Sequence, residues 1–441
     1  MRKFWIVLLA LGLVAAFSMP AFAAVDGKFS GSLRMRGWYD DNLKSLDKDK
    51  YTGAGARQFY DNRLRMQPEF KIAEGLTLTT RFDALEKKWG QTLSTAASVD
   101  FNDSIKWERA YVTFVTKAGV GMVGYQPTRE FGTVFGNSSG SDPRIKWTIP
   151  VGDFSIFGVI EKVTEDTANM GTNVDSDRDR YQLGAIYKFK GGDAGMQIEL
   201  ERNALNRTTA ATPYTREFYV FEPYVKYKAG PVYIEAEAFY ATGDYAKYDQ
   251  GTTVPKPTDV KFDSKALYLL ANIDFAPAYA GFLFAYGSGD DPDTTDKREG
   301  GLMATQSLNS SWNAALMMQS YEYRNQVGNR QGNTTAANSE YTDNIWFYQI
   351  YAGVKPMKEL DVKLALSYAY ADKKPKVAGV EYVSDKYGTE LDLTATYKIY
   401  NNLSYMVGFG YLWTGDFYKG TDNSIVTAND YLVMHQLMLS F

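Results

Sequence analysis

Apolar and polar residues alternate along much of the chain with a period of two. In the segment 60–72, Leu64, Met66 and Phe70 fall on one face, while charged and amide side chains fall on the other. The same pattern recurs near residues 76–84, 180–189, 196–201, 361–370 and 390–399. Because successive side chains of a β-strand point to opposite faces, this pattern predicts long strands with one apolar and one polar face.

Alternation alone also fits a water-soluble β-sandwich, and three further features favour a transmembrane barrel. The strands run to roughly 10–13 residues, longer than the ordinary strand and suited to a tilted membrane crossing. Short and long connections alternate along the chain. Tyr, Phe and Trp gather near the strand ends, as the aromatic belts of a membrane protein require. The fold predicted is an all-β, antiparallel up-and-down transmembrane barrel.

The rhythm of turns gives the number of strands. Eight short turns and nine long loops make seventeen connections, and therefore eighteen strands. An even number places both termini of the chain on the periplasmic side, with the short turns there and the long loops outside. The longest loop is 288–343, a candidate plug or lid, since loops of such length usually have a function. Within it, the spacing of Trp312, Ala315, Leu316 and Gln319 predicts a short helix.

The first residues have the layout of a secretory signal peptide. Arg2 and Lys3 precede an apolar stretch from Phe4 to Phe17, and a small-x-small site ends at Ala23. We expect residues 1–23 to be removed, which leaves 24–441 as a single outer-membrane barrel domain. Beyond this stretch, the longest uncharged segment is 300–321, and its many amide and hydroxyl groups make it unsuitable as a membrane helix.

Composition excludes several kinds of chemistry. The 441 residues contain no Cys and one His, and the formal net charge is −4. The absence of Cys excludes thiolate metal sites, Cys nucleophiles, disulfides and covalently attached haem. A single His cannot form a metal site built from several His residues. The small negative net charge lacks the basic character typical of nucleic-acid-binding proteins. We therefore expect no metal, no cofactor and no nucleic-acid partner.

The polar phase of the strands predicts which side chains line the lumen. Early strands supply mostly arginines, and middle and late strands supply mostly carboxylates. Opposite walls of this kind would set up a transverse field that orients charged solutes. The alternative is that these charges pair across strands and fill space. The predicted pore-lining residues are Arg34, Arg36, Arg63, Arg65, Arg81, Arg109, Glu199, Glu201, Glu235, Glu237, Glu390 and Asp392.

Loops outside the strands offer weaker signals. The loop Thr128–Pro143 contains Phe, Gly and Ser residues and is a candidate constriction, although ordinary external loops have a similar composition. Acidic clusters occur at Asp175–Asp177 and Asp290–Asp293. Neither has the spacing of a dedicated calcium loop, which favours solvated charge over a calcium site.

The end of the chain alternates from Asp430 to Phe441. A last strand that ends in an aromatic residue resembles the assembly signal of bacterial outer-membrane barrels, which implies the barrel assembly machinery as a partner through Phe441. His435 falls in the apolar phase of this strand. A lone imidazole without partners to tune it is interpreted as structural rather than catalytic.

Several short motifs, together with the signal peptide and Phe441, resemble outer-membrane porins of the alginate-export type. They are Gly124-Tyr125-Gln126 at a strand end, Gly287–Asp291 leading into a long loop, and Gly388–Leu393 within a strand. The usual Gly-Arg-Gln of that family reads Gly124-Tyr125-Gln126 here. General porins share most of these marks. The resemblance implies an 18-stranded monomeric barrel that transports a solute.

These observations predict an outer-membrane porin of a Gram-negative cell, with a water-filled channel for small polar or charged solutes. Its partners would be outer-membrane lipid and the solute. The alternatives are a dedicated exporter of an alginate-like polysaccharide and the barrel sheath of a larger outer-membrane complex. A barrel enzyme would need a Ser/His or Asp/His pair, and the one His lies on the lipid-facing phase, so we expect no enzyme.

Overall fold

The computed structural model describes residues 26–90, 105–138, 140–166, 175–209, 212–249, 256–308, 311–327 and 342–441. The predicted signal peptide, residues 1–23, lies outside this part of the chain. Within the described residues, eighteen long strands form one closed antiparallel sheet. They are β1 (Asp26–Asp40), β2 (Arg57–Ala73), β3 (Leu76–Lys88), β4 (Lys106–Thr116), β5 (Gly119–Pro127), β6 (Ser141–Val151), β7 (Phe154–Thr164), β8 (Arg178–Phe189), β9 (Gly192–Asn203), β10 (Tyr214–Ala229), β11 (Val232–Tyr248), β12 (Val260–Phe275), β13 (Ala278–Gly287), β15 (Ile345–Met357), β16 (Leu360–Tyr370), β19 (Lys386–Tyr400), β20 (Leu403–Thr414) and β21 (Asp430–Ser440).

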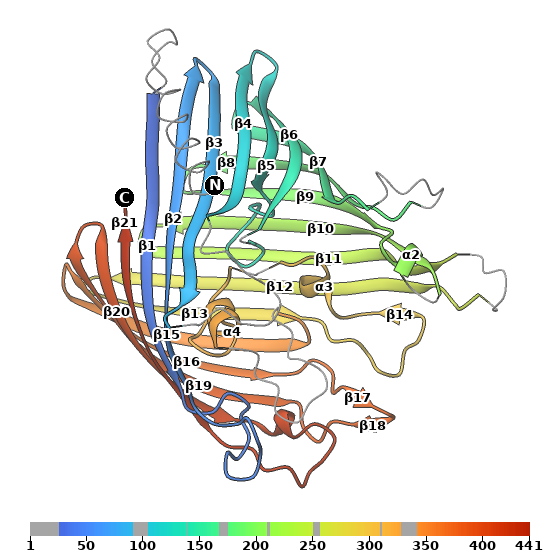
Figure 1. The fold of residues 1–441 in the computed structure, drawn as a ribbon, viewed down its shortest axis with the longest axis vertical. Coiled ribbons are helices and arrows are strands. Elements are labelled where there is room, and N and C mark those ends of the chain that lie inside the picture. Colours follow the sequence, from blue (N-terminus) through green and yellow to red (C-terminus); the bar gives the residue numbers. More distant parts are fainter. Residues whose placement is uncertain are drawn as a thin grey trace, which may run out of the picture.

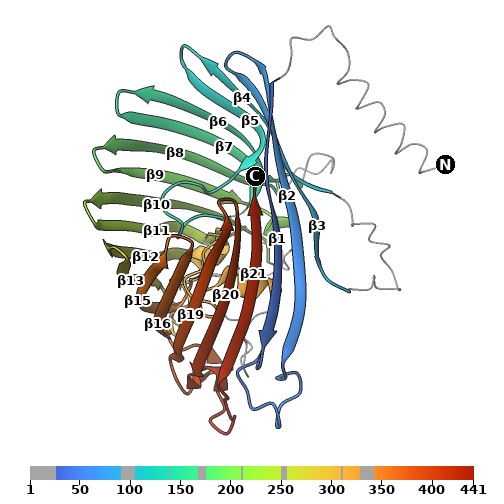
Figure 2. The same ribbon diagram turned by 90° about the vertical axis from the view of Figure 1, so that its left-hand side faces the viewer.

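Each long strand pairs with the next long strand along the chain, and the first closes onto the last (Figure 1). Arg36 of β1 lies opposite Gln436 of β21, and Gly31 exchanges two backbone hydrogen bonds with Phe441. Figure 2 shows β1 and β21 side by side. Tight turns join the strands at one end of the barrel, which we call the turn end. Long connections join them at the other end, the loop end. The predicted eighteen-stranded barrel is confirmed.

The alternation along each strand separates an apolar outer face from a polar inner face. Leu183 is 64% exposed, whereas Gln182 beside it is buried. Ile160 is 57% exposed, and the next residue, Glu161, is buried. Apolar side chains that are exposed on a closed barrel are matched to lipid, and the polar interior requires charged groups to find partners.

Short elements occupy the connections between the long strands. They are α2 (Asn206–Thr209), β14 (Lys297–Arg298), α3 (Leu302–Thr305), α4 (Tyr321–Gln326), β17 (Lys376–Val377), β18 (Val380–Glu381) and the 3₁₀ turn η1 (Asp416–Lys419). Among the described residues, no helix has both the length and the apolar character needed to cross a bilayer.

Two of the long connections fold back among the strands. These are loop 128–140, between β5 and β6, and the 288–343 loop, which carries α3 and α4 (Figure 1). Phe135 of the first loop is fully buried, stacks on Tyr268 of β12 with ring centroids 5.0 Å apart, and meets Trp312 of the second loop edge-on at 5.2 Å. The two loops therefore pack against each other and against the inner wall.

The helix predicted from the spacing of Trp312, Ala315, Leu316 and Gln319 is wrong in its position. Residues 312–319 are not helical, and the helices α3 and α4 lie on either side of them. The reason is that the backbone N–H groups of Leu316, Met317 and Met318 donate to carboxylates of the barrel wall. A helix would need those groups for its own hydrogen bonds.

Candidate functional site

Arginines on the inner face of β1–β4 stand directly opposite one another. Arg34 of β1 is in register with Arg63 of β2, and Arg81 of β3 is in register with Arg109 of β4. Like charges placed opposite each other across two strands are destabilising. This wall, which we call the arginine wall, therefore needs counter-charges close by.

Carboxylates of the same strands supply the tightest of these counter-charges. Arg36 binds Asp61 at 2.9 Å, and Arg65 binds Asp83 at 2.6 Å. Glu108 binds Arg81. Sequence reasoning left these three carboxylates out of the site, although Asp61, Asp83 and Glu108 lie on strands already predicted to carry inward charge. The arginine wall therefore carries charges of both signs. This agrees in part with the alternative prediction that the inward charges pair across strands.

Two arginines of the wall are held less tightly. Arg63 has Glu86 at 3.7 Å, and Arg109 has Glu130 at 3.5 Å; the side chains of these carboxylates are 43% and 54% exposed. The Nε atom of Arg63 is buried and has no hydrogen-bond partner within the described residues. Ion pairs with exposed carboxylates contribute little stability, so an anion in solution can compete for these two arginines.

A cavity of about 800 Å³ lies against this wall. Arg34, Arg63 and Arg65 line it, whereas Arg36, Arg81 and Arg109 do not. Its charged lining consists of six cations and five carboxylates, namely Arg34, Arg63, Arg65, Lys87, Lys88, Lys106, Asp61, Asp83, Glu86, Glu108 and Glu322. The 288–343 loop contributes Glu322 and Ser311 to this lining.

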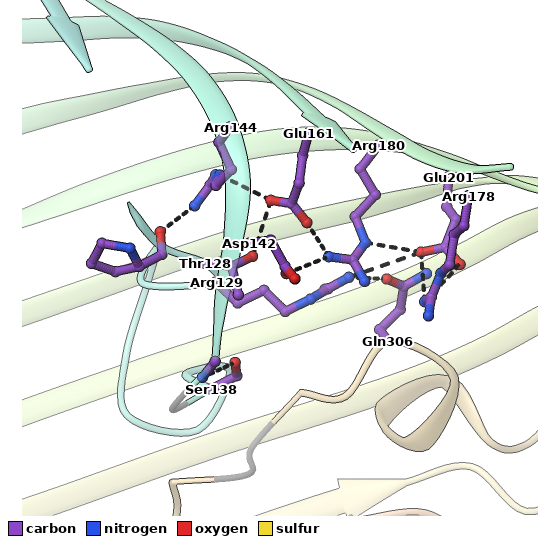
Figure 3. Close-up of polar contacts among 12 residues, drawn as sticks. Thr128, Arg129, Ser138, Asp142, Arg144, Glu161, Arg178, Arg180, Glu201 and Gln306 are labelled. Carbon is purple, nitrogen blue, oxygen red and sulfur yellow. Dashed lines mark hydrogen bonds and ion pairs between the residues drawn. The ribbon is translucent and has the colours of Figure 1, made fainter. Parts of the chain in front are cut away.

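Two carboxylates of the predicted acidic wall, Glu199 and Glu201, are neutralised by arginines, and Figure 3 shows the network around Glu201. Arg180 lies between Glu161 and Glu201 and binds the latter at 3.0 Å. Arg178 also binds Glu201, at 2.8 Å. Arg129, which comes from loop 128–140, binds Glu199 at 3.3 Å. Glu199 and Glu201 are thus counter-ions within a packed network rather than free charges facing a solute.

Arg129 also connects the two inner loops. Its guanidinium donates to the side chain of Gln306 in the 288–343 loop (Figure 3). Its φ is 56°, in the left-handed region that a residue other than glycine rarely adopts. Arg178 of β8 donates to the carbonyl of Thr305 at 3.0 Å. The same arginine cluster therefore fixes both loops against β8 and β9.

The remaining predicted carboxylates also hold the inner loops or are satisfied by hydroxyls. Glu237 accepts from the Thr133 N–H at 3.1 Å and the Gly136 N–H at 2.9 Å, so it anchors loop 128–140. Glu235 accepts from the hydroxyls of Tyr233 and Tyr268, both at 2.7 Å. All four carboxyl oxygens of Glu235 and Glu237 thus accept hydrogen bonds.

Glu390 and Asp392 on β19 anchor the 288–343 loop. Glu390 accepts from the backbone N–H groups of Met317 and Met318, at 2.7 and 2.6 Å. Asp392 accepts from the Leu316 N–H at 3.1 Å. These carboxyl groups are buried, and burial increases the cost of breaking the hydrogen bonds that they accept.

The helix α4 completes the attachment of this loop to the arginine wall. Glu322 binds Arg34 at 3.0 Å and also binds Arg36. At the other end of α4, Lys88 donates to the Gln326 carbonyl at 2.7 Å, and Arg57 donates to the Val327 carbonyl. Burial opposes ionisation of Glu322, but the charges of Arg36 and Arg34 outweigh burial and lower its pKa.

A family model described as Gram-negative porin matches residues 10–342 of the sequence. The match covers well over half of the chain. The chain belongs to the family of Gram-negative porins. A comparison with curated proteins finds no match.

Solved structures similar to this porin are also outer-membrane porins of the same fold. A BenF-like porin from Pseudomonas fluorescens Pf-5 aligns with a TM-score of 0.50 and 10% identity over 94% of this chain and 99% of its own. Pseudomonas aeruginosa OccK11 (OpdR) gives 0.50 and 9% over 94% and 96%. P. aeruginosa OccK2 (OpdF), in complex with glucuronate, gives 0.50 and 12% over 94% and 97%. At such identities, the likeness shows the fold alone.

The porin is an outer-membrane channel for small solutes, as the sequence predicts. Its partners are accordingly the lipid around its apolar face and the solute that passes through it. The family and the structural neighbours are channels rather than enzymes. The narrower resemblance to alginate-export porins is not established by these comparisons.

The acidic cluster of the 288–343 loop forms ion pairs in this porin. Asp290 binds Arg298 at 2.5 Å, Asp291 binds Lys373 at 3.1 Å, and Asp293 binds Lys376 at 2.5 Å. Among the described residues, no group of three or more acidic, His or Cys side chains is placed to hold a metal ion. The carboxylates join neighbouring loops at the loop end, which is a structural use that sequence spacing did not reveal.

Proposed function

We propose that this porin is a diffusion channel that favours small anions, and that the arginine wall is the path they follow. The observation that carries the proposal is the pair of like-charged contacts, Arg34 opposite Arg63 and Arg81 opposite Arg109. Like charges placed directly opposite each other lower the stability of a sheet. In a channel that conducts anions, these arginines have a function that explains why they are present although they lower stability.

The weak attachment of Arg63 and Arg109 supports exchange with a solute. Their carboxylate partners are solvent-exposed and lie 3.7 and 3.5 Å away. A solute anion that replaces either carboxylate gains a charged hydrogen bond without breaking a buried ion pair. A wall of such positions allows binding that is firm enough for entry and weak enough for release.

The proposed pore-lining set is narrower than the twelve residues predicted from the sequence. Arg34, Arg63 and Arg65 line the cavity, and Arg81 and Arg109 continue the same wall. The remaining residues of the set are proposed to hold the lumen in shape through ion pairs, tyrosine hydroxyls or loop anchors. They are Arg36, Glu199, Glu201, Glu235, Glu237, Glu390 and Asp392.

The inner loops argue against the export of a polysaccharide and against a barrel that sheathes another protein. Both roles need a wide lumen. Here the 288–343 loop is attached to β19 through Glu390, to β8 through Arg178 and to β1 through Arg34. A polymer or an inserted partner would have to break these contacts. The alginate-export resemblance therefore remains a proposal about barrel architecture only.

Export and assembly complete the proposal. Cleavage after Ala23 would release the mature chain, and the last strand with Phe441 would engage the barrel assembly machinery. No catalytic step is proposed: His435 lies on β21 with its ring 5.5 Å from that of Tyr60 and 5.7 Å from that of Tyr405. Both tyrosines are more than a third exposed on the outer face, which agrees with a place among the aromatic residues near the lipid.

Reversal potentials in planar bilayers across a KCl gradient test the proposal. The wild type is expected to prefer chloride, and the double variant Arg63→Gln with Arg109→Gln is expected to shift toward potassium. Arg202→Gln is the matched control, because Arg202 alternates with the inward Glu201 and Asn203 and pairs with Asp175 at the loop end. The complex of OccK2 with glucuronate makes that sugar acid a suitable first organic anion.

A wild type that prefers potassium would contradict the proposal. A double variant that conducts and keeps the wild-type preference would also contradict it. In the second case, these arginines would be structural.

A further inference from the structure

A second cavity, of about 510 Å³, lies among β11, β12, β13, β15 and β16, away from the arginine wall. The 288–343 loop borders both cavities through Ser311. Three tyrosines and a tryptophan line this second cavity: Tyr268, Tyr279, Tyr351 and Trp312. We call it the aromatic cavity. It reaches toward the turn end, because Tyr279 is the second residue of β13.

Most polar groups in the aromatic cavity are already bonded to the protein. Both oxygens of Glu235 accept from tyrosine hydroxyls. Asn272 accepts from the Tyr351 hydroxyl at 3.1 Å, and Gln349 donates to the Ala314 carbonyl at 2.8 Å. A neutral polyhydroxylated solute, which needs many free donors and acceptors, would find few here.

Lys363 is the exception. Its ammonium lies 4.4 Å from the centroid of the Tyr351 ring. Among the described residues, Asp392 and Asp361 attract it through their charge, but neither forms an ion pair with it. An ammonium carries three donors and no acceptor. A cation–π contact offsets part of its desolvation but leaves these donors unused. Water can accept from these donors, and an anion that displaces this water would accept from them and also match the positive charge.

We infer that the aromatic cavity binds a small aromatic monocarboxylate. The carboxylate would accept hydrogen bonds from Lys363, and the flat ring would pack against Tyr351 and Tyr279, whose own rings are 6.4 Å apart. Two charged side chains line this cavity, Lys363 and Glu235, and both oxygens of Glu235 already accept hydrogen bonds from tyrosine hydroxyls. Aromatic walls with a few well-placed polar groups are the usual composition of a small-molecule site. Aromatic faces favour a flat ring over an aliphatic body of equal charge.

This site goes beyond the proposed function. It lies on another wall and involves none of the residues assigned to anion preference. Each proposal can therefore be refuted without affecting the other. Loss of chloride preference in the Arg63 and Arg109 double variant concerns only the arginine wall, while the behaviour of aromatic acids concerns Lys363 and Tyr351.

Block of the single-channel KCl current by added benzoate tests the site. In the wild type, benzoate is expected to block at about tenfold lower concentration than acetate, which lacks the ring, or benzamide, which lacks the charge. Lys363→Gln is expected to lose about this tenfold advantage, and Lys363→Arg to keep most of it. Lys398→Gln, at an exposed lysine of β19, is the matched control and should behave as the wild type.

The ring contact has its own pair of variants. Tyr351→Leu is expected to remove the preference for benzoate over cyclohexanecarboxylate, whereas Tyr351→Phe keeps it, since only the hydroxyl bond to Asn272 is lost. Equal block by benzoate, acetate and benzamide in the wild type would overturn the inference. So would a conducting Lys363→Gln channel that benzoate blocks as strongly as it blocks the wild type.

Discussion

Arg34 on the first strand and Glu322 in the 288–343 loop form an ion pair of 3.0 Å, although 288 positions separate them in the sequence. Arg36 binds the same carboxylate. One glutamate thus serves two arginines of the wall and fixes α4 in the lumen. Removing it would leave the buried Arg34 without its counter-ion and Arg36 with Asp61 alone, and an uncompensated buried charge is costly.

Glu322→Gln is therefore expected to loosen the 288–343 loop and raise single-channel conductance. The amide keeps the size of the side chain but loses the charge that attracts Arg34 and Arg36. Conductance at low and high salt measures the effect, and the difference from the wild type should shrink at 1 M salt, where screening weakens the wild-type pair. Glu359→Gln, in the turn before β16, is the control. Equal conductance of wild type and Glu322→Gln would show that α4 stays in place without the ion pair.

Acid should release the same contact. The pKa of Glu322 lies below its ordinary value of 4.5, because Arg36 and Arg34 outweigh the effect of burial. A carboxyl with a lowered pKa contributes stability that is present above the unfolded value and is lost as pH falls through the folded value. Wild-type conductance should therefore approach that of Glu322→Gln only below about pH 4.5. Convergence of the two proteins already at neutral pH would contradict the assignment.

Asp343 should give the opposite pH dependence. It accepts from the N–H groups of Met303 at 3.1 Å and Ala304 at 2.8 Å, and burial raises its pKa to about 6. The folded loop then binds a proton more tightly than the unfolded loop, so its packing strengthens as pH falls from 7 toward the ordinary value of 3.8. Hydrogen exchange of residues 302–308, corrected for intrinsic rates, should slow over this range. Asp343→Asn should remove the trend, and protection that weakens from pH 7 to 5 would refute it.

Glu237→Gln is expected to release loop 128–140 without a large change in ion selectivity. A carboxylate accepts from both the Thr133 and the Gly136 N–H groups, whereas an amide presents its own N–H to one of them. Limited proteolysis should cut the variant faster within this loop. Glu235→Gln is the matched control, because tyrosine hydroxyls can donate to or accept from an amide. Equal cleavage of both variants would show that Phe135 and Arg129 hold the loop without Glu237.

The orientation of β2 predicts unequal effects for two nearby arginine substitutions. Leu64 lies opposite Leu33 on the outer face, while Gln67 is three positions along and faces inward, where it donates to Glu69. Leu64→Arg would place a charge in lipid at a cost of roughly 2–4 kcal/mol near the bilayer centre. Its yield of folded, heat-modifiable protein in outer membranes should be much lower than that of Gln67→Arg. Equal yields would show that the assigned faces are reversed.

The sequence by itself determined the barrel and the direction of its side chains. Alternation is a local property, because each residue's face follows from the pleat of its own strand. The segment 60–72 thus shows its inward arginines without any knowledge of its neighbours. Turn positions are also local, since residues such as Gly75, with a φ of 73°, mark them. The eighteen strands, the apolar outer face and the inward position of Arg63 and Glu237 follow from such signals.

The tertiary structure alone decided which inward charges stay available to a solute. Glu237 reaches Thr133 across 104 positions, and Glu390 reaches Met317 across 73. These contacts exist because closure of the barrel brings distant strands around a common lumen and two loops fold into it. Periodicity carries no information about such contacts, so Glu237 and Glu390 looked like Glu199 in the sequence. The curvature of the closed sheet and the packing of Phe135 and Trp312 made them anchors, and left Arg63, Arg109 and Lys363 only weakly attached.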